Sequence, residues 1–221
     1  MKGWTRTFGT EQRGFTSQSN PVSTTIATYD QRAAYYLGTR GGGDLTRHFA
    51  AFTERVRAGS LVVDVGCGPG WHSVELARRG LRVVSLDLSR GMLREAQTLG
   101  ARDLAQADMR RLPIASASAD GFWVMASFLH VPRADADATL NEFHRVLKPH
   151  GVLYLGVKGG EGERFGNPLD GLPRYFVYWR EDELDAKLRA AGFEIVTAWT
   201  DAPEEKATRM DTWINRVVVS H

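Results

Sequence analysis

Apolar runs and amphipathic stretches alternate along most of the chain, and this alternation predicts the elements of an α/β domain. Short apolar runs bounded by Gly, Asp or Pro predict strands, and apolar positions three or four apart predict the helices between them. The predicted strands are residues 61–65, 82–86, 103–107, 120–126, 152–157, 193–199 and 212–219. The predicted helices are residues 24–37, 44–56, 71–79, 89–99, 135–147 and 181–191.

This order is typical of a parallel sheet with helices on both faces. The last two strands have a connection too short for a crossover helix, so we expect an antiparallel hairpin at one edge. Residues 1–23 are polar and aperiodic, and we expect a flexible extension before a single domain of residues 24–221. Within it, we expect a lid helix and hinge at residues 24–43 and an irregular substrate-side lid at residues 159–179.

Composition narrows the class of protein. The chain has 221 residues, of which 43% are hydrophobic and 24% charged, as in an ordinary globular domain. The single cysteine, Cys67, excludes an intramolecular disulfide and a Cys-rich zinc site. No window reaches the roughly 18 apolar residues of a membrane helix, and the N-terminus lacks the apolar core of a secretory signal. We therefore expect a cytoplasmic protein without membrane contact.

Charge is distributed unevenly along the chain. Residues 1–60 carry +4, residues 61–160 carry +2 and residues 161–221 carry −4, which sum to the net charge of +2. An acidic last third would repel a polyanion, so we expect no nucleic-acid partner. Arginine makes up 23 of the 28 basic residues, which would suit phosphate or carboxylate binding, but we favour a codon bias as the explanation.

The segment between the first predicted strand and its helix carries the candidate chemistry. Gly66, Gly68 and Gly70 have G-x-G-x-G spacing, whereas a dinucleotide fingerprint has G-x-G-x-x-G and would need a glycine in place of Trp71. Glycines at such a turn let a ligand approach the backbone. Asp64 would repel a pyrophosphate but attract an ammonium group, which favours a cationic ligand over NAD.

Two further acids end the next predicted strands. Asp87 lies 21 residues after Gly66, where a carboxylate can accept hydrogen bonds from both ribose hydroxyls. Asp108 ends the third strand and could accept from an adenine amino group, with the backbone of Met109 against the ring. Each acid alone is ordinary at a strand end, but together with Asp64 they indicate a nucleoside-containing ligand.

These features, in this order, resemble the motifs of class I S-adenosylmethionine-dependent methyltransferases, most of all the methyltransferase domain 11 group. The motifs are residues 64–70, Asp87, Asp108, FWVMASFLHVP and HRVLKPHGVLYLGVK. The resemblance covers about residues 24–219. It implies a Rossmann-like three-layer α/β sandwich with a seven-stranded, mostly parallel sheet and an antiparallel last strand.

The resemblance also implies S-adenosylmethionine as the cofactor, S-adenosylhomocysteine as the product and no metal. The residues it implies for cofactor binding are Asp64, Gly66, Cys67, Gly68, Gly70, Asp87, Leu88, Met92, Asp108, Met109, Ala126, Tyr29 and Tyr36. We expect Cys67 to pack as a small residue rather than to act as a nucleophile.

The acceptor side is less defined by the sequence. His130 follows the fourth strand and is the candidate catalytic residue, as a general base or a substrate contact, unless it only packs or caps a helix. The candidate substrate-binding residues are Phe128, Lys158, Arg164, Tyr175 and Tyr178. The cations, with Arg174, could bind an anionic acceptor and the aromatic rings, with Trp179, a planar one. Alternatively they fasten the lid to the domain.

We therefore expect a methyltransferase acting on an oxygen or nitrogen atom of a small molecule, since no second domain is present to grip a polymer. A tRNA wobble-uridine-type methyltransferase is an alternative, because RYFVYWREDEL faintly resembles a segment of such enzymes. A non-catalytic S-adenosylmethionine-binding protein and an NAD-dependent reductase are the others. The acceptor and the oligomeric state stay open.

Overall fold

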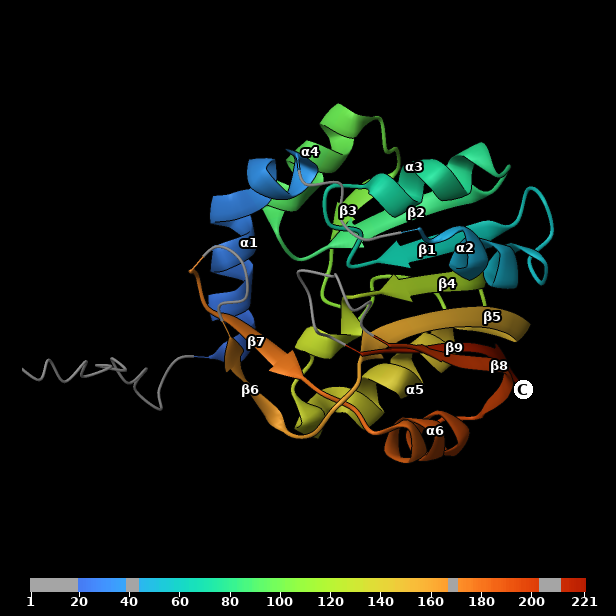
Figure 1. Ribbon diagram of the computed structural model, residues 1–221. Helices are drawn as coiled ribbons and strands as arrows, with labels where there is room; N and C mark the ends of the chain where they lie inside the picture. The colour runs from blue at the N-terminus through green and yellow to red at the C-terminus, as the bar shows by residue number, and fades with distance from the viewer. Residues whose placement is uncertain (1–19, 39–43, 167–170, 203–211) are drawn as a thin grey trace, which may run out of the picture.

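The sheet of the computed structural model has the predicted α/β architecture (Figure 1). The structure describes residues 20–38, 44–166, 171–202 and 212–221. Seven of the described strands form one sheet in the order β3-β2-β1-β4-β5-β9-β8. Their bounds are β1 Leu61–Val65, β2 Arg82–Asp87, β3 Leu104–Gln106, β4 Ala119–Met125, β5 Leu147–Lys158, β8 Phe193–Asp201 and β9 Trp213–Ser220. Strand β9 runs antiparallel to both β5 and β8, which confirms the mostly parallel sheet with an antiparallel last strand.

Helices cover both faces of this sheet. Their bounds are α1 Pro21–Gly38, α2 Thr46–Thr53, α3 Trp71–Arg78, α4 Arg90–Leu99, α5 Ala136–Val146 and α6 Glu181–Ala190, with 3₁₀ turns η1 Phe128–His130 and η2 Arg133–Asp135. Among the helices described, none has the length and apolar character needed to cross a membrane.

Successive side chains along each strand point to opposite faces of the sheet, and they form one apolar core on each face. On one face, α5 and α6 pack on Val63, Phe122 and Leu153. On the other, α2 and α3 pack on Val62, Trp123 and their neighbours. The Trp123 ring stacks between Phe49 of α2 at 4.6 Å and Tyr154 of β5 at 4.1 Å. Burial of such apolar surface on both faces holds the carboxyl ends of the strands at one fixed edge.

Helix α1 begins earlier than the sequence predicted. It starts at Pro21, so the last residues of the predicted extension 1–23 are helical. Asn20 caps it, because its Oδ1 accepts from the amides of Val22 at 3.0 Å and Ser23 at 3.3 Å. Pro21 occupies the first helical position, where its missing N–H costs nothing. The rest of the extension, residues 1–19, and the predicted hinge at 39–43 lie outside the described residues.

The predicted irregular lid at residues 159–179 contains regular structure, so that expectation was wrong. Strands β6 Glu163–Gly166 and β7 Arg174–Val177 pair antiparallel in a separate small sheet. Backbone pairing with β7 compensates for the weak strand propensity of β6, and Phe165 packs edge-on against Tyr175 at 5.2 Å.

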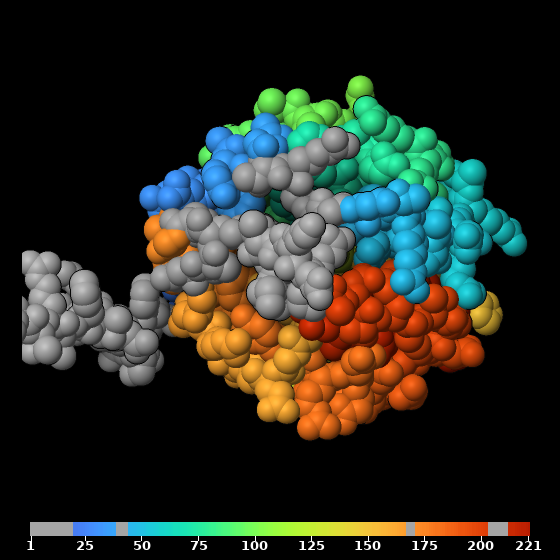
Figure 2. Space-filling model, viewed as in Figure 1, coloured from blue at the N-terminus to red at the C-terminus, as the bar shows by residue number. Residues whose placement is uncertain are grey.

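Helix α1 stands at the carboxyl edge of the sheet, where the arrowheads of β1 and β4 point (Figure 1). It is fastened to β7, because Thr25 Oγ1 accepts from the amide of Tyr175 at 2.9 Å and Thr28 Oγ1 donates to the carbonyl of Pro173 at 2.7 Å. In the space-filling view, the blue surface of α1 adjoins the orange surface of this segment (Figure 2). Segments far apart in sequence therefore enclose one edge of the sheet.

Candidate functional site

The glycine loop between β1 and α3 has the backbone that its sequence requires. Gly66, Gly68 and Gly70 have φ values of +72°, +55° and +86°, a region that side chains other than hydrogen rarely tolerate. A Cβ on Gly66 would lie 2.3 Å from Cβ of Ser127, and 3.6 Å from the end of the Met109 side chain. The loop therefore brings Met109 and the end of β4 to the same place as the glycines.

Asp64 is a buried acid beside this loop. It is 1% exposed, and its Oδ2 accepts from Ser73 Oγ at 2.6 Å, while Ser85 Oγ donates to Ser73 Oγ at 2.9 Å. Burial raises the pKa of Asp64 to about 7, against the hydrogen bond from Ser73 that lowers it, and the charge of Asp87 raises it further. A carboxyl group with such a pKa is strongly stabilised in its charged form by a nearby cation.

Asp87 lies at the end of β2 and faces the same loop. Its carboxylate accepts from the amide of Gly68 at 2.9 Å and from that of Ser89 at 2.8 Å. Burial raises the pKa of Asp87 to about 6, although these amides lower it. The two acids with raised pKa values, Asp64 and Asp87, thus flank one glycine loop, which is the pattern expected at a functional site.

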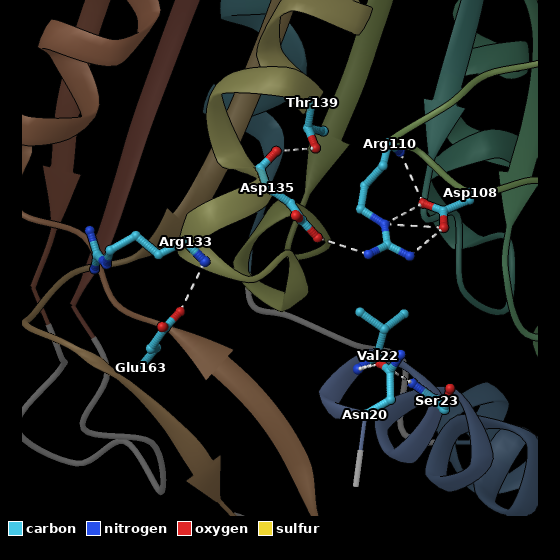
Figure 3. Close-up of polar contacts among 9 residues, drawn as sticks. All are labelled: Asn20, Val22, Ser23, Asp108, Arg110, Arg133, Asp135, Thr139 and Glu163. Atoms are coloured by element: carbon cyan, nitrogen blue, oxygen red, sulfur yellow. Dashed lines mark hydrogen bonds and ion pairs between the residues drawn. The ribbon is translucent and has the colours of Figure 1, made fainter. Parts of the chain in front are cut away.

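Asp108 is engaged by a neighbouring arginine (Figure 3). Both carboxylate oxygens accept from Arg110, at 2.7 Å for Nη2, and Arg110 Nη1 donates to Asp135 at 2.8 Å. Burial raises the pKa of Asp108, but the hydrogen bonds and charge of Arg110 outweigh it and leave the pKa below its usual value. Asp108 is therefore an ionised acceptor already fixed in orientation, and adenine contact from it stays a prediction.

The remaining predicted cofactor residues lie around this loop. Cys67 is 6% exposed and packs with Ala96 and Ala101, and burial raises the pKa of its thiol, which agrees with packing rather than nucleophilic attack. Met92 is 2% exposed and lies in the first turn of α4, where the capping residue Ser89 accepts from its amide through Oγ at 3.1 Å. The carbonyl of Leu88 accepts from the side chain of Gln106 at 2.9 Å.

Ala126 directly follows β4 and has a strained conformation. Its φ is +58°, which is uncommon for a residue with a Cβ, and its amide donates to the carbonyl of Gly156 at 3.0 Å. The next residue, Ser127, donates from Oγ to the carbonyl of Val65 at 2.6 Å. These contacts tie the ends of β1, β4 and β5 together, and residues held in sparsely populated backbone regions cluster at functional sites.

His130 follows in η1 and has partners on both ring nitrogens. Its Nε2 lies 2.7 Å from the hydroxyl of Tyr29, and its Nδ1 lies 2.5 Å from the carbonyl oxygen of Tyr175. Burial lowers the pKa of His130 to about 4, and the charges of Arg174 and Lys158 lower it further, against the Tyr175 carbonyl. The structure thus joins His130 to helix α1 and to β7.

The predicted substrate-side residues form an aromatic and cationic cluster. Lys158, at the end of β5, is 7% exposed and lies 4.5 Å above the Phe176 ring. Arg164 lies 3.9 Å above the Tyr178 ring, and Arg174, 4% exposed, lies 5.4 Å above the Tyr36 ring. These contacts bring the cations and aromatic rings together, and binding of an acceptor by them stays a prediction.

Two of the predicted aromatic residues lie in the core. Phe128 and Trp179 are fully buried and stack on each other at 5.7 Å. In this structure their contacts are packing contacts behind the site, so contact of Phe128 with an acceptor stays a prediction.

The sequence did not predict three polar residues that hold this region together. Asp30 of α1 accepts from Ser89 Oγ and from the amide of Gly91, both at 2.7 Å, which docks α1 on the start of α4. Ser73 supports Asp64 from α3. Arg133 donates its amide to Glu163 of β6 at 2.9 Å, which joins the hairpin to the chain just after His130 (Figure 3). Asp30, Ser73 and Arg133 lie on helical segments with no local motif, so only three-dimensional contact identifies them.

A second polar network lies on the α2 side of the sheet. Asp201 Oδ2 accepts from Asn215 Nδ2 at 2.9 Å and lies 3.1 Å from His48 Nε2. Tyr154 donates its hydroxyl to Asn215 Oδ1 at 2.7 Å. Across the part of the chain that the structure describes, no three or more His, Cys, Asp or Glu side chains gather as the ligands of a metal ion would.

Comparison with known proteins agrees with this geometry. Residues 63–155 match the model of the family described as "Methyltransferase domain". The solved Burkholderia thailandensis 1,6-didemethyltoxoflavin-N1-methyltransferase, with bound 1,6-didemethyltoxoflavin and S-adenosylhomocysteine, has the same fold. It aligns with a TM-score of 0.70 over 91% of each chain, at 21% identity.

Two curated relatives are more similar in sequence. The malonyl-[acyl-carrier protein] O-methyltransferase of Erwinia billingiae is 40% identical over 109 residues, which is 49% of this chain and 42% of that protein. The ubiquinone biosynthesis O-methyltransferase of Xanthomonas oryzae is 31% identical over 155 residues, which is 62% of this chain and 64% of that protein. The chain thus spans less than two thirds of the length of either relative.

The seven-stranded sheet, with the glycine loop at its carboxyl edge, is the Rossmann-like fold of class I methyltransferases. The family match over residues 63–155, together with this fold, supports a class I S-adenosylmethionine-dependent methyltransferase. The resemblance inferred from the motifs is therefore confirmed.

Proposed function

We propose that this protein transfers the methyl group of S-adenosylmethionine to an oxygen or nitrogen atom of a small molecule. The observation that carries the proposal is the pair of acids with raised pKa values, Asp64 and Asp87, on either side of a glycine loop at the carboxyl edge of the sheet. Ligands of open α/β sheets bind at this edge.

The residues present fit this cofactor. Asp87 would accept from the ribose hydroxyls, and Asp64 would face the ammonium group of the amino-acid end, where a cation stabilises its carboxylate. Asp108 and Met109 would hold the adenine. When bound, S-adenosylmethionine supplies a methyl group on a sulfonium cation. The chain has to hold the acceptor in line with that methyl and exclude water.

The segments around the site favour a small acceptor. Helix α1 and the β6–β7 hairpin, which we propose act as lids, meet each other through Thr25 and Thr28 beside His130. The relatives named above are, by their names, a malonyl-[acyl-carrier protein] O-methyltransferase, a ubiquinone biosynthesis O-methyltransferase and a 1,6-didemethyltoxoflavin-N1-methyltransferase. The −4 charge of residues 161–221 disfavours a nucleic-acid acceptor.

An acceptor screen tests this proposal. The purified protein is incubated with isotope-labelled S-adenosylmethionine and a fractionated metabolite extract, with bulk tRNA in a parallel reaction. We expect label in a small-molecule fraction, and much less label in that fraction with the Asp87→Ala variant. Label in tRNA alone would assign the chain to the tRNA alternative. Binding of S-adenosylhomocysteine without transfer to any fraction would favour the non-catalytic alternative.

A further inference from the structure

The turn between β2 and α4 determines how the carboxylate of Asp87 is oriented. Its Oδ1 accepts from the amide of Ser89 at 2.8 Å, and its Oδ2 accepts from the amide of Gly68 at 2.9 Å. Hydrogen bonds from backbone amides to a carboxylate are strong, and one on each oxygen restricts rotation of the group. The orientation of Asp87 therefore depends on where the backbone of Ser89 lies.

Asp30 of helix α1 holds this turn from outside its own segment. One oxygen, Asp30 Oδ1, accepts from Ser89 Oγ and from the amide of Gly91, both at 2.7 Å. Ser89 is the N-cap of α4, where its own Oγ accepts from the amide of Met92 at 3.1 Å. A carboxylate beside the first turn of a helix also interacts favourably with the helix dipole. Asp30 thus adds to the N-cap of α4 from a different helix.

The backbones of α1 and α4 lie in close contact at this point (Figure 1). A Cβ on Gly91 would lie 2.9 Å from the carbonyl oxygen of Asp30 and 3.1 Å from Cβ of Ala33. A glycine is needed for so close an approach, and Ser89 beside it is 1% exposed. Helix packing therefore places the Asp30 side chain directly against the turn that holds Asp87.

We propose that Asp30 is a positioning residue for cofactor binding. When α1 is docked on α4, Asp30 holds Ser89 and thereby keeps the Asp87 carboxylate in the orientation that binds the ribose hydroxyls. The proposal rests on the proposed function and deepens it, because it links the affinity for the cofactor to the docking of α1. Such a link is reciprocal, so a bound cofactor stabilises the docked position of α1 by the same factor.

The charge of Asp30 gives a second signature of this arrangement. Burial raises the pKa of Asp87 to about 6, and the charge of Asp30 also raises it, against the backbone amides that lower it. Asp30→Asn keeps a side-chain oxygen that can accept both hydrogen bonds, but it removes the charge. It should therefore lower the pKa of Asp87 and leave the turn in place. Asp30→Ala removes the charge and both hydrogen bonds.

The test compares these two variants with Gln31→Ala, which changes the exposed next residue of the same helix. By calorimetry at pH 8, we expect Asp30→Ala to bind S-adenosylhomocysteine about fivefold more weakly than the wild type, the value of about one net hydrogen bond. Asp30→Asn and Gln31→Ala should bind it as the wild type does. Carbon NMR of the Asp87 carboxyl should show a lower pKa in Asp30→Asn and an unchanged pKa in Gln31→Ala.

Hydrogen exchange of the free protein gives a readout that needs no ligand. We expect the amides of Ser89 and Gly91 to exchange faster in Asp30→Ala than in the wild type, and at the same rate in Gln31→Ala. Wild-type affinity or unchanged exchange in Asp30→Ala would overturn the proposal, as would an Asp30→Asn variant that binds as weakly as Asp30→Ala. Absence of S-adenosylhomocysteine binding by the wild type would instead contradict the proposed function, and the exchange rates would still decide whether Asp30 holds the turn.

Discussion

Protonation of Asp64 should control the affinity of the cofactor near neutral pH. In the free protein burial raises the pKa of Asp64 to about 7, so a large fraction of the molecules carries a neutral carboxyl at pH 7. The ammonium group of a bound cofactor would lower this pKa, since an opposite charge favours the carboxylate. Binding should therefore release a proton, and affinity should rise with pH up to about 7 and then level off.

The magnitude follows from that pKa. For a group that titrates near 7, the ionised fraction falls about tenfold between pH 8 and pH 6, which corresponds to about 1.4 kcal/mol of binding free energy. Ser73→Ala removes the hydrogen bond that lowers the pKa of Asp64, so the profile should move to higher pH. Asp87, with a pKa of about 6, should add a further loss at the acid end.

Isothermal titration with S-adenosylhomocysteine at pH 6 to 8 measures this effect. Titrations in buffers of different ionisation heat count the protons released. The Asp64→Asn variant is the matched control, and it should bind weakly with the step near pH 7 removed. An affinity of the wild type that is constant from pH 6 to pH 8, with no proton released, would refute this account of Asp64.

Two glycine substitutions test the packing of the site by urea unfolding. Gly66→Ala places a Cβ 2.3 Å from the Ser127 side chain and should cost about 1–3 kcal/mol more than Gly68→Ala, which has a positive φ but no atom within 4 Å. Equal losses would show that backbone strain alone matters. Gly91→Ala places a Cβ 2.9 Å from the α1 backbone and should destabilise the protein by about 1–3 kcal/mol, whereas Gly38→Ala, with open space around it, should not. Equal stability of both variants would mean that α1 is not docked on α4 as described.

The sheet and the cofactor-side acids could be predicted because their signals are local. Strands at the centre of a parallel sheet are continuous apolar runs, and the acids lie at their carboxyl ends, as Asp87 does at the end of β2. The glycine spacing likewise reports the positive φ values found at Gly66, Gly68 and Gly70. The apolar pattern of the strands and the residues at their carboxyl ends are therefore enough to predict the cofactor side of the site.

The acceptor side could not be predicted, because it depends on contacts between distant residues. Tyr29 and His130 are 101 residues apart and meet only when α1 docks. The β6–β7 hairpin has few apolar positions in alternation, so its pairing gives no sequence pattern. The positive φ of Ala126 is imposed by the junction of β1, β4 and β5, and alanine gives no hint of it.

Calorimetric titration of the wild type with S-adenosylhomocysteine and, separately, with NAD tests the central claim most directly. We predict one binding site for S-adenosylhomocysteine, an affinity at least about tenfold weaker in Asp87→Ala because a charged hydrogen-bond partner of the ribose is lost, and no binding of NAD. Binding of NAD without binding of S-adenosylhomocysteine would contradict the account.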